Sequence, residues 1–148
     1  ARVAGGDNLR KVGDGGYDLG ARQRQIRDAL LAGERFDVDD MLAIHLDDRA
    51  IFLGRWRELL LTLLDAEAIA GNPARAEFRR LVDGWTARAA ADDVGYRLVR
   101  GFRMTVRDRV FDMLTAPIVD RFGSGVLRRR SNQFEGPLWE TKHPQEKS

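Results

Sequence analysis

Histidine, the side chain most often used as a general base or zinc ligand, occurs only twice in the 148 residues, as His45 and His143. His45 stands in a stretch with helical apolar spacing, and His143 stands in a polar tail. The two are too far apart in sequence to form a local pair of metal ligands, so we expect no metal site. We interpret His45 as a satisfied or surface side chain of a helix and assign no catalytic role to His143.

Clustered aspartates could form acid–base pairs or a cation site. The clusters are Asp37/Asp39/Asp40, Asp47/Asp48 and Asp92/Asp93. The first and last precede predicted helices, where a carboxylate caps free N–H groups and interacts favourably with the helix dipole. The middle cluster, followed by Arg49, lies inside a predicted helix, where we expect a salt bridge within the helix or to its neighbour. Capping and ion pairing explain these carboxylates better than catalysis does.

Arginines recur along one predicted helix and directly after it, and together they could form a basic strip for phosphates. They are Arg97, Arg100, Arg103, Arg107, Arg109, Arg128, Arg129 and Arg130. However, Asp108 and Asp112 are interleaved with them, and the net charge of the chain is only +2. We favour a solvated or partner-facing charged surface and do not expect nucleic acid as a partner. An independent helical module that binds nucleic acid or an acidic partner through this strip stays open as the alternative.

No residue of the chain is recognisable as an activated nucleophile. Cysteine is absent, which excludes disulfides, thiolate metal sites and cysteine nucleophiles. The three serines, Ser124, Ser131 and Ser148, all lie towards the C-terminus. The glycines match no phosphate-binding loop and no serine-nucleophile motif. The residues therefore provide no complete catalytic apparatus.

The elements that must position these residues are predicted to be helices. Hydrophobic residues make up 43% and charged residues 32%, as in globular proteins, and no apolar run is long enough to span a membrane. Apolar spacing and capping residues predict helices from Asp18 to near Gly33, from Asp37 through Leu64 to a stop at Gly71, from Pro73 to Val82, and from Asp92 or Asp93 to just before Pro117. We predict a mainly α fold of about four helices in an orthogonal or bundle-like domain.

Glycine and proline positions set the expected boundaries of that domain. Residues 1–16 are rich in glycine and are predicted to be a connector loop, residues 17–122 form the helical domain, and residues 123–148 form an irregular tail. Only short extended pieces, such as Asn132 to Phe134, are expected in the tail. Its apolar Phe134, Leu138 and Trp139 are expected to pack on the domain or on parts of a larger parent protein.

Several stretches resemble the β chain of the penicillin-acylase family of amidohydrolases. They are residues 16–31 (GYDLGARQRQIRDALL), 36–49 (FDVDDMLAIHLDDR), 92–103 (DDVGYRLVRGFR) and 132–139 (NQFEGPLW), which occur in the order of the family. The resemblance implies that the chain is a helical part of that β chain, projecting from an αββα core. The parent is then expected to hydrolyse an amide such as a β-lactam side chain or an N-acyl homoserine lactone.

The resemblance also implies where the chemistry takes place. These enzymes are N-terminal-nucleophile hydrolases, in which a serine exposed by self-cleavage attacks the amide and its own α-amine acts as base. That serine and an oxyanion-hole asparagine are expected upstream of Ala1, so this chain alone is expected to be inactive. Arg22 matches a family arginine that supports the active site, and it is the one residue we carry over. Its other interpretation is a surface cation near a helix start, where the dipole slightly disfavours it.

Expected partners and location follow from the same resemblance. We expect no cofactor in this chain, and any calcium of the parent to be bound by residues outside it. The partners are the remainder of the parent α and β chains and its acyl-amide substrate, with no membrane contact, and the isolated chain is expected to form homodimers through exposed apolar surface. A periplasmic or secreted parent is expected.

Overall fold

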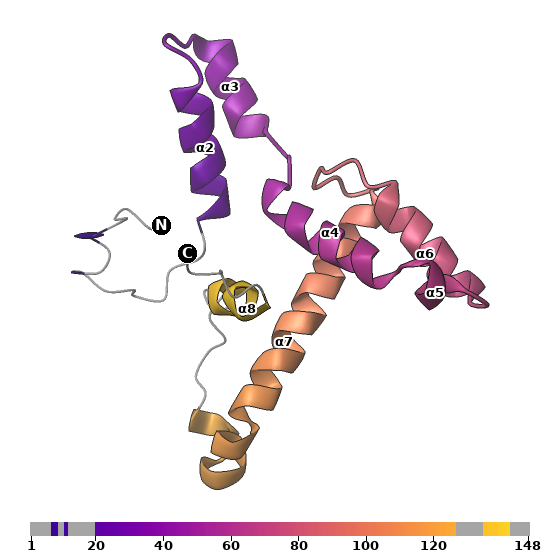
Figure 1. The fold of residues 1–148 in the computed structure, drawn as a ribbon. Coiled ribbons are helices and arrows are strands. Elements are labelled where there is room, and N and C mark those ends of the chain that lie inside the picture. Colours follow the sequence, from indigo (N-terminus) through magenta and orange to yellow (C-terminus); the bar gives the residue numbers. More distant parts are fainter. Residues whose placement is uncertain (1–6, 9–10, 12–19, 127–134, 143–148) are drawn as a thin grey trace, which may run out of the picture. The chain divides into compact units, whose positions relative to one another are not determined.

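A computed structural model of the protein describes residues 7, 8, 11, 20–126 and 135–142 (Figure 1). Regular structure in these residues is helical, apart from one isolated antiparallel bridge between Arg49 and Arg88. The prediction of a mainly α fold is confirmed. The chain divides into a central unit, residues 33–106, and a terminal unit, residues 1–32 and 107–148. A single domain over residues 17–122 stays a prediction.

The central unit contains five complete helical elements and the first part of α7. They are α3 (Val38–Leu46), the 3-10 helix η1 (Ile51–Leu53), α4 (Gly54–Leu63), α5 (Ala66–Ile69), α6 (Pro73–Asp83) and the first part of α7 (Val94–Phe122). The terminal unit contains α2 (Ala21–Leu31), the remainder of α7, η2 (Ser124–Val126) and α8 (Glu135–Lys142). No helix in the described part of the chain is both long and apolar enough to cross a membrane.

Side-chain caps start α3 and α6 where the sequence predicted them. Asp37 Oδ1 accepts from the Asp40 amide at 2.9 Å, and the Asp37 amide donates to Asp40 Oδ2 at 3.1 Å, which completes the predicted capping box. Asn72 Oδ1 accepts from the Arg75 amide at 3.1 Å, with Pro73 in the first turn of α6. Both predicted caps are confirmed.

The prediction of one long second helix from Asp37 through Leu64 to Gly71 is wrong, because the chain leaves the helix after Leu46 and again after Leu63. Asp47 has an extended backbone, and its Oδ1 accepts from the amide of Arg49 at 3.1 Å. Such a side-chain hydrogen bond competes with the helical pattern. The amide of Ala50 donates to the carbonyl of Ala87 at 2.8 Å, a partner that periodicity cannot reveal.

The end predicted for α7, just before Pro117, is also wrong, because the helix includes Pro117 and ends at Phe122. A proline inside a helix removes one backbone hydrogen bond but does not by itself end the helix. Gly123 adopts φ 80°, and its amide donates to the carbonyl of Val119 at 2.8 Å. This left-handed glycine cap, rather than the proline, terminates α7.

Within the tail, residues 135–142 form α8, which corrects the expectation of an irregular segment. Pro137 is the third residue of this helix, where a missing N–H leaves no hydrogen bond unmade. The pair Gly136-Pro137 thus belongs to the first turn of a helix. Leu138 and Trp139 are half-buried on α8. The extended piece predicted from Asn132 to Phe134 lies outside the described residues. Of the connector loop predicted for residues 1–16, the structure describes only Asp7, Asn8 and Lys11, and these are helical.

The core of the central unit forms around Trp56 of α4, whose side chain is 1% exposed. Its ring meets Phe102 of α7 edge to face, with the centroids 6.0 Å apart. The other buried apolar side chains of the central unit are Ala50, Leu53, Leu60, Val82, Trp85 and Val99. Full burial of a valine or leucine side chain stabilises the fold by about 1.5–3 kcal/mol.

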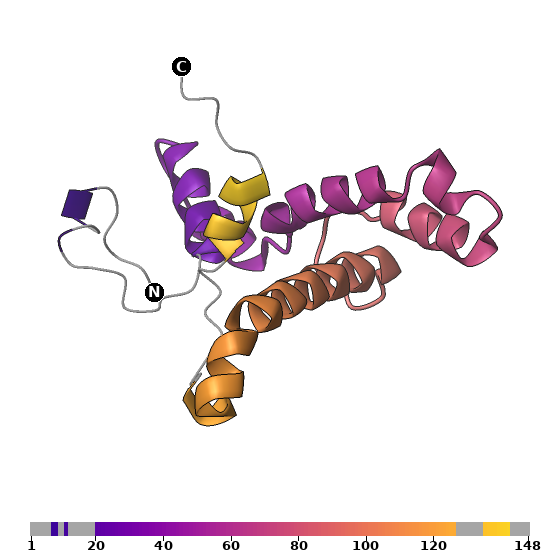
Figure 2. The same cartoon turned by 60° about the horizontal axis from the view of Figure 1, so that its bottom comes forward.

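Two arginines tie α4 to α6 by capping each other's helix ends. Arg57 of α4 donates to the carbonyls of Val82 at 3.2 Å and Asp83 at 2.6 Å, at the end of α6. Arg79 of α6 donates to the carbonyls of Leu61 at 2.6 Å and Leu64 at 2.7 Å, at the end of α4. Terminal carbonyls lack partners within their own helix, and a cation there also interacts favourably with the helix dipole. Figure 2 shows the chain running from α4 through α5 into α6.

Candidate functional site

Arg22, the residue singled out by the resemblance, lies in the first turn of α2. The helix begins after Gly20, whose φ of 66° is a left-handed conformation, and the Gly20 carbonyl accepts from the Arg24 amide at 2.9 Å. Arg22 is half-buried, whereas Arg24 and Arg27 on the same helix are exposed. Arg27 pairs with Asp28 at 2.5 Å on the surface. Burial therefore distinguishes Arg22 from the other arginines of α2.

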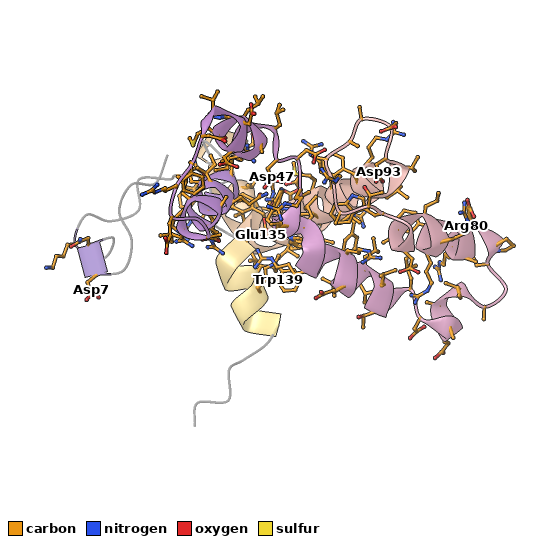
Figure 3. The ribbon with its side chains drawn as sticks, turned by 90° about the horizontal axis from the view of Figure 1, so that it is seen from above. Asp7, Asp47, Arg80, Asp93, Glu135 and Trp139 are labelled. Atoms are coloured by element: carbon orange, nitrogen blue, oxygen red, sulfur yellow. The ribbon has the colours of Figure 1, made fainter. Side chains whose placement is uncertain are left out.

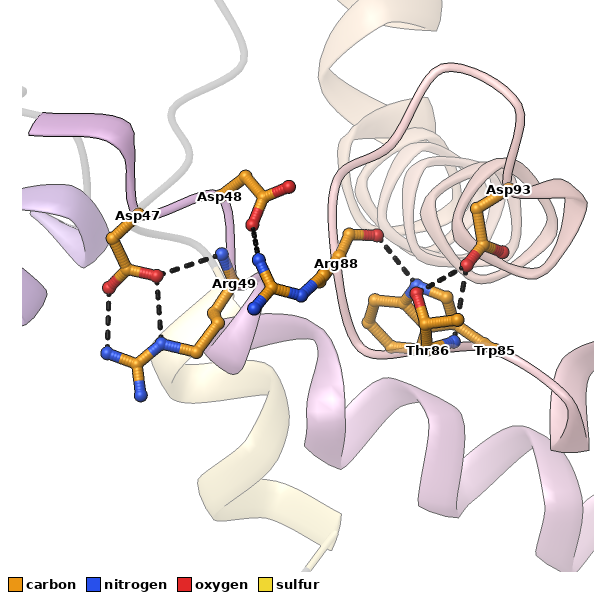
Figure 4. Close-up of polar contacts among 7 residues, drawn as sticks. All are labelled: Asp47, Asp48, Arg49, Trp85, Thr86, Arg88 and Asp93. Atoms are coloured by element: carbon orange, nitrogen blue, oxygen red, sulfur yellow. Dashed lines mark hydrogen bonds and ion pairs between the residues drawn. The ribbon is translucent and has the colours of Figure 1, made fainter. Parts of the chain in front are cut away.

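A second group of polar residues joins the end of α3 to the segment between α6 and α7. This segment, residues 84–93, is called the strap below. Two backbone hydrogen bonds connect it to residues 47–50, one from Ala50 to Ala87 at 2.8 Å and one from Ala89 to Asp48 at 2.9 Å. The guanidinium of Arg88 forms an ion pair with the carboxylate of Asp48 (Figure 4). All of these contacts lie within the central unit.

Asp47 and Asp93, which Figure 3 labels, each accept hydrogen bonds from donors close to them in the chain. The carboxylate of Asp47 accepts from Nε and Nη2 of Arg49, both at 2.8 Å. This hydrogen bond and the attraction of the two charges raise the pKa of Arg49 above its usual value. The salt bridge predicted for this cluster is confirmed, although it follows a helix instead of lying within one.

Asp93 caps α7, as the sequence predicted for this cluster. Its Oδ1 accepts from the Tyr96 amide at 3.0 Å, and its Oδ2 accepts from the Thr86 hydroxyl at 2.7 Å and amide at 3.2 Å. Burial opposes ionisation, but these hydrogen bonds, with one from the Gly95 amide, outweigh it and hold the pKa of the Asp93 carboxyl below its usual value. Asp93 is thus an ionised structural cap rather than a proton acceptor near neutral pH.

The predicted arginine strip is interrupted in the described part of α7. Arg97, Arg100 and Arg109 are exposed, but Arg103 and Arg107 are each only 8% exposed. The guanidinium of Arg103 lies 5.2 Å from the centroid of the Phe52 ring, a cation–π contact. Arg107 pairs with Asp108 at 3.1 Å. The remaining three predicted members, Arg128, Arg129 and Arg130, lie outside the described residues.

The histidine and serine candidates do not converge on a site. His45 Nδ1 lies 2.8 Å from the Met41 carbonyl on the exposed surface of α3, as expected for a satisfied helical histidine. Ser124 is exposed in η2, whereas His143, Ser131 and Ser148 lie outside the described residues. Among the residues that the structure describes, no three His, Cys, Asp or Glu side chains gather in a way that could hold a metal ion.

Comparison with known proteins supplies what the geometry alone does not. Residues 2–147 match the family model described as penicillin amidase. The chain belongs to the penicillin amidase family. No curated protein matches the chain, and no solved structure does. The resemblance stated from the sequence is confirmed, and with it the assignment to a hydrolase family.

Three arginines and one alanine carry structural roles that the sequence analysis did not assign. Arg57 and Arg79 cap helix ends, Arg88 pairs with Asp48, and Ala87 adopts φ 63°. No sequence signal indicates the two arginine caps, because the carbonyls that they bind stand 15 to 26 positions away in the chain. No sequence signal indicates a left-handed alanine, because glycine or asparagine is the usual residue there.

Proposed function

We propose that the chain is the helical part of the β chain of a penicillin-acylase-like amidohydrolase. The parent would hydrolyse the amide bond of an acylated amine such as a β-lactam side chain or an N-acyl homoserine lactone. The observation that carries the proposal is the family match over residues 2–147. The described part of the chain is helical, which favours a structural part of the enzyme over a complete active site.

The division of labour in this proposal follows N-terminal-nucleophile chemistry. A terminal serine attacks the amide carbonyl, its α-amine takes the proton, and an asparagine stabilises the oxyanion. The remainder of the parent supplies these groups, together with the residues that hold any calcium. The parent is assigned to the periplasm or the exterior, and the chain separated from it would associate through its exposed apolar side chains.

A comparison of amide hydrolysis by the isolated chain and by the full-length parent tests the proposal. The substrates are a chromogenic phenylacetyl amide and a long-chain acyl amide, which separate the two acyl classes. Turnover by the parent alone is the expected result. Turnover by the isolated chain would contradict the inactive-alone assignment, and a parent inert on both substrates would contradict the amidohydrolase itself.

Arg22 is the residue of this chain that the proposal connects with catalysis. In the parent, Arg22→Ala should lower kcat/KM by roughly 10- to 100-fold, since misplaced reacting groups lose rate steeply. Arg22→Lys should restore only part of the rate, because lysine lacks the planar fork of arginine. The matched control is Arg24→Ala, an exposed arginine on the same helix. Equal effects of Arg22→Ala and Arg24→Ala would reduce Arg22 to a surface cation.

A further inference from the structure

The direction of α3 depends on the segment that follows it. None of the nine residues of α3 is buried, and its apolar Val38, Leu42 and Leu46 are 83%, 53% and 69% exposed. The helix therefore adds no side chain to the core of the central unit. Its orientation relative to that core must be set largely by residues 47–50, where the chain enters the buried η1–α4 region.

Residues 47–50 are bound to the strap through Asp48, which makes two contacts, and through Ala50. Asp48 accepts a backbone hydrogen bond from Ala89 at 2.9 Å and also pairs through its carboxylate with Arg88. Beside it, Ala50 donates to Ala87 at 2.8 Å and is itself 4% exposed. This set of contacts between residues 48–50 and 87–89 is called the latch. It combines two backbone hydrogen bonds with an exposed ion pair.

The latch contains the one non-glycine residue with positive φ among those the structure describes. Ala87 has φ 63°, a conformation that costs an L-residue roughly 1–2 kcal/mol. Strained backbone of this kind persists only where the surroundings over-determine it. The carbonyl that Ala87 presents in this conformation is the acceptor for Ala50. The left-handed conformation of Ala87 thus presents the carbonyl that accepts the hydrogen bond from Ala50.

The strap itself is fixed to the core on its other side. Trp85 is 5% exposed, and its Nε1 donates to the carbonyl of Arg88 at 2.9 Å. Its ring lies beside Tyr96 of α7, with the centroids 6.3 Å apart. Thr86 is bound to Asp93, as Figure 4 shows. The backbone of Arg88 is therefore held by Trp85, and its side chain pairs with Asp48.

We propose that the latch is a conformational device that holds α3 in one direction relative to the core of the central unit. Opening it breaks the Asp48–Arg88 ion pair and the two backbone hydrogen bonds, leaves α4, α6 and α7 packed, and releases α3 as a unit. The ion pair is exposed on both sides, so salt weakens it. The latch is therefore sensitive to ionic strength, whereas the core is not.

The absence of cysteine allows a direct test in the full chain. Spin labels on Ala43→Cys in α3 and Ala74→Cys in α6, both exposed positions, report the distance between the two helices. One narrow distance distribution is expected at low salt. In the Asp48→Asn/Arg88→Gln background the distribution should broaden, and it should narrow again in the charge-swapped Asp48→Arg/Arg88→Asp background. The matched control is Glu77→Gln, which breaks an exposed ion pair on α6.

Amide hydrogen exchange on the same variants separates latch opening from unfolding. Asp48→Asn should speed exchange of the Ala50 and Ala89 amides by roughly 2- to 5-fold, as for loss of an exposed ion pair, with α4 and α6 unchanged. Ala87→Gly should keep the latch, since glycine accepts this φ, whereas Ala87→Val should open it. An unchanged distance distribution in the double variant, or equal acceleration throughout the unit, would overturn the proposal.

Discussion

The carboxylate of Asp93 connects two parts of the central unit, the strap and the start of α7. It receives hydrogen bonds from Thr86 in the strap and from the first turn of α7. These donors favour the charged form and lower its pKa relative to the unfolded chain. A lowered pKa in the folded state means that the stabilisation is present above the unfolded value, about 3.9, and is lost as the pH falls through the folded value.

Replacing Asp93 by alanine should therefore have a pH-dependent cost. At neutral pH we expect Asp93→Ala to lower the free energy of unfolding by about 1–2 kcal/mol, as for loss of a helix cap. Below about pH 4 the difference should narrow as the wild-type carboxyl takes up its proton. Thermal unfolding followed by circular dichroism from pH 3 to 7 measures both effects.

Asp92 provides the control for this prediction, since it is the adjacent aspartate and is exposed. Asp92→Ala should change the free energy of unfolding by no more than about 0.5 kcal/mol. A pH-independent difference between wild type and Asp93→Ala would show that the charge of Asp93 contributes nothing and that only its cap geometry matters.

The start of α7 is placed by a close approach that only glycine permits. A Cβ on Gly95 would lie 2.5 Å from the Cβ of Trp85 and 2.8 Å from the carbonyl oxygen of Leu81. The second neighbour is backbone and cannot rotate away. Gly101, six residues further along the same helix, has no heavy atom within 4 Å of the corresponding position. The two glycines differ in surroundings but share a helix.

Alanine at these two positions should therefore act in opposite directions. Gly95→Ala should destabilise the chain by about 1–3 kcal/mol through overpacking. Gly101→Ala should stabilise it by about 0.5–1 kcal/mol, because alanine loses less backbone entropy in a helix. Urea unfolding of both variants tests this, with each serving as control for the other. Stabilisation by Gly95→Ala would mean that α7 does not approach α6 as closely as described.

The two units of the molecule differ in how their apolar side chains are used. All the buried apolar side chains among the described residues belong to the central unit, around Trp56, Leu53 and Val82. In the terminal unit, Met113 and Leu114 are 75% and 63% exposed, and Leu31 is 77% exposed. Hydrophobic burial is the main favourable term in folding, so the central unit should carry most of the stability.

Hydrogen exchange in the full chain should show this difference. Amides of α4, of the end of α6 and of Val94 to Val106 should be the slowest to exchange, whereas those of α2 should exchange faster, because few buried contacts mean low local stability. Mass spectrometry of peptic peptides resolves these segments. Equal protection of α2 and α4 would show that the exposed side chains of the terminal unit are covered in solution.

Helix existence and capping could be predicted from the sequence because both rest on local chemistry. The capping box at Asp37 and Asp40, the Asn72 cap and the role of Asp93 each require residues within three positions of one another. The family likewise follows from ordered local motifs along the chain. Arg22 as an active-site support stays a prediction that the parent enzyme must test.

The break after α3 and the latch were decided by tertiary contacts. Apolar spacing continues through residues 47–53, but the partners that draw this segment out of the helix, Ala87 and Ala89, stand about 40 positions later. Likewise, the burial of Arg103 and Arg107 removes two members of a strip that looks continuous in the sequence. Periodicity encodes which face of a helix is apolar, whereas pairing between distant segments depends on how the chain packs.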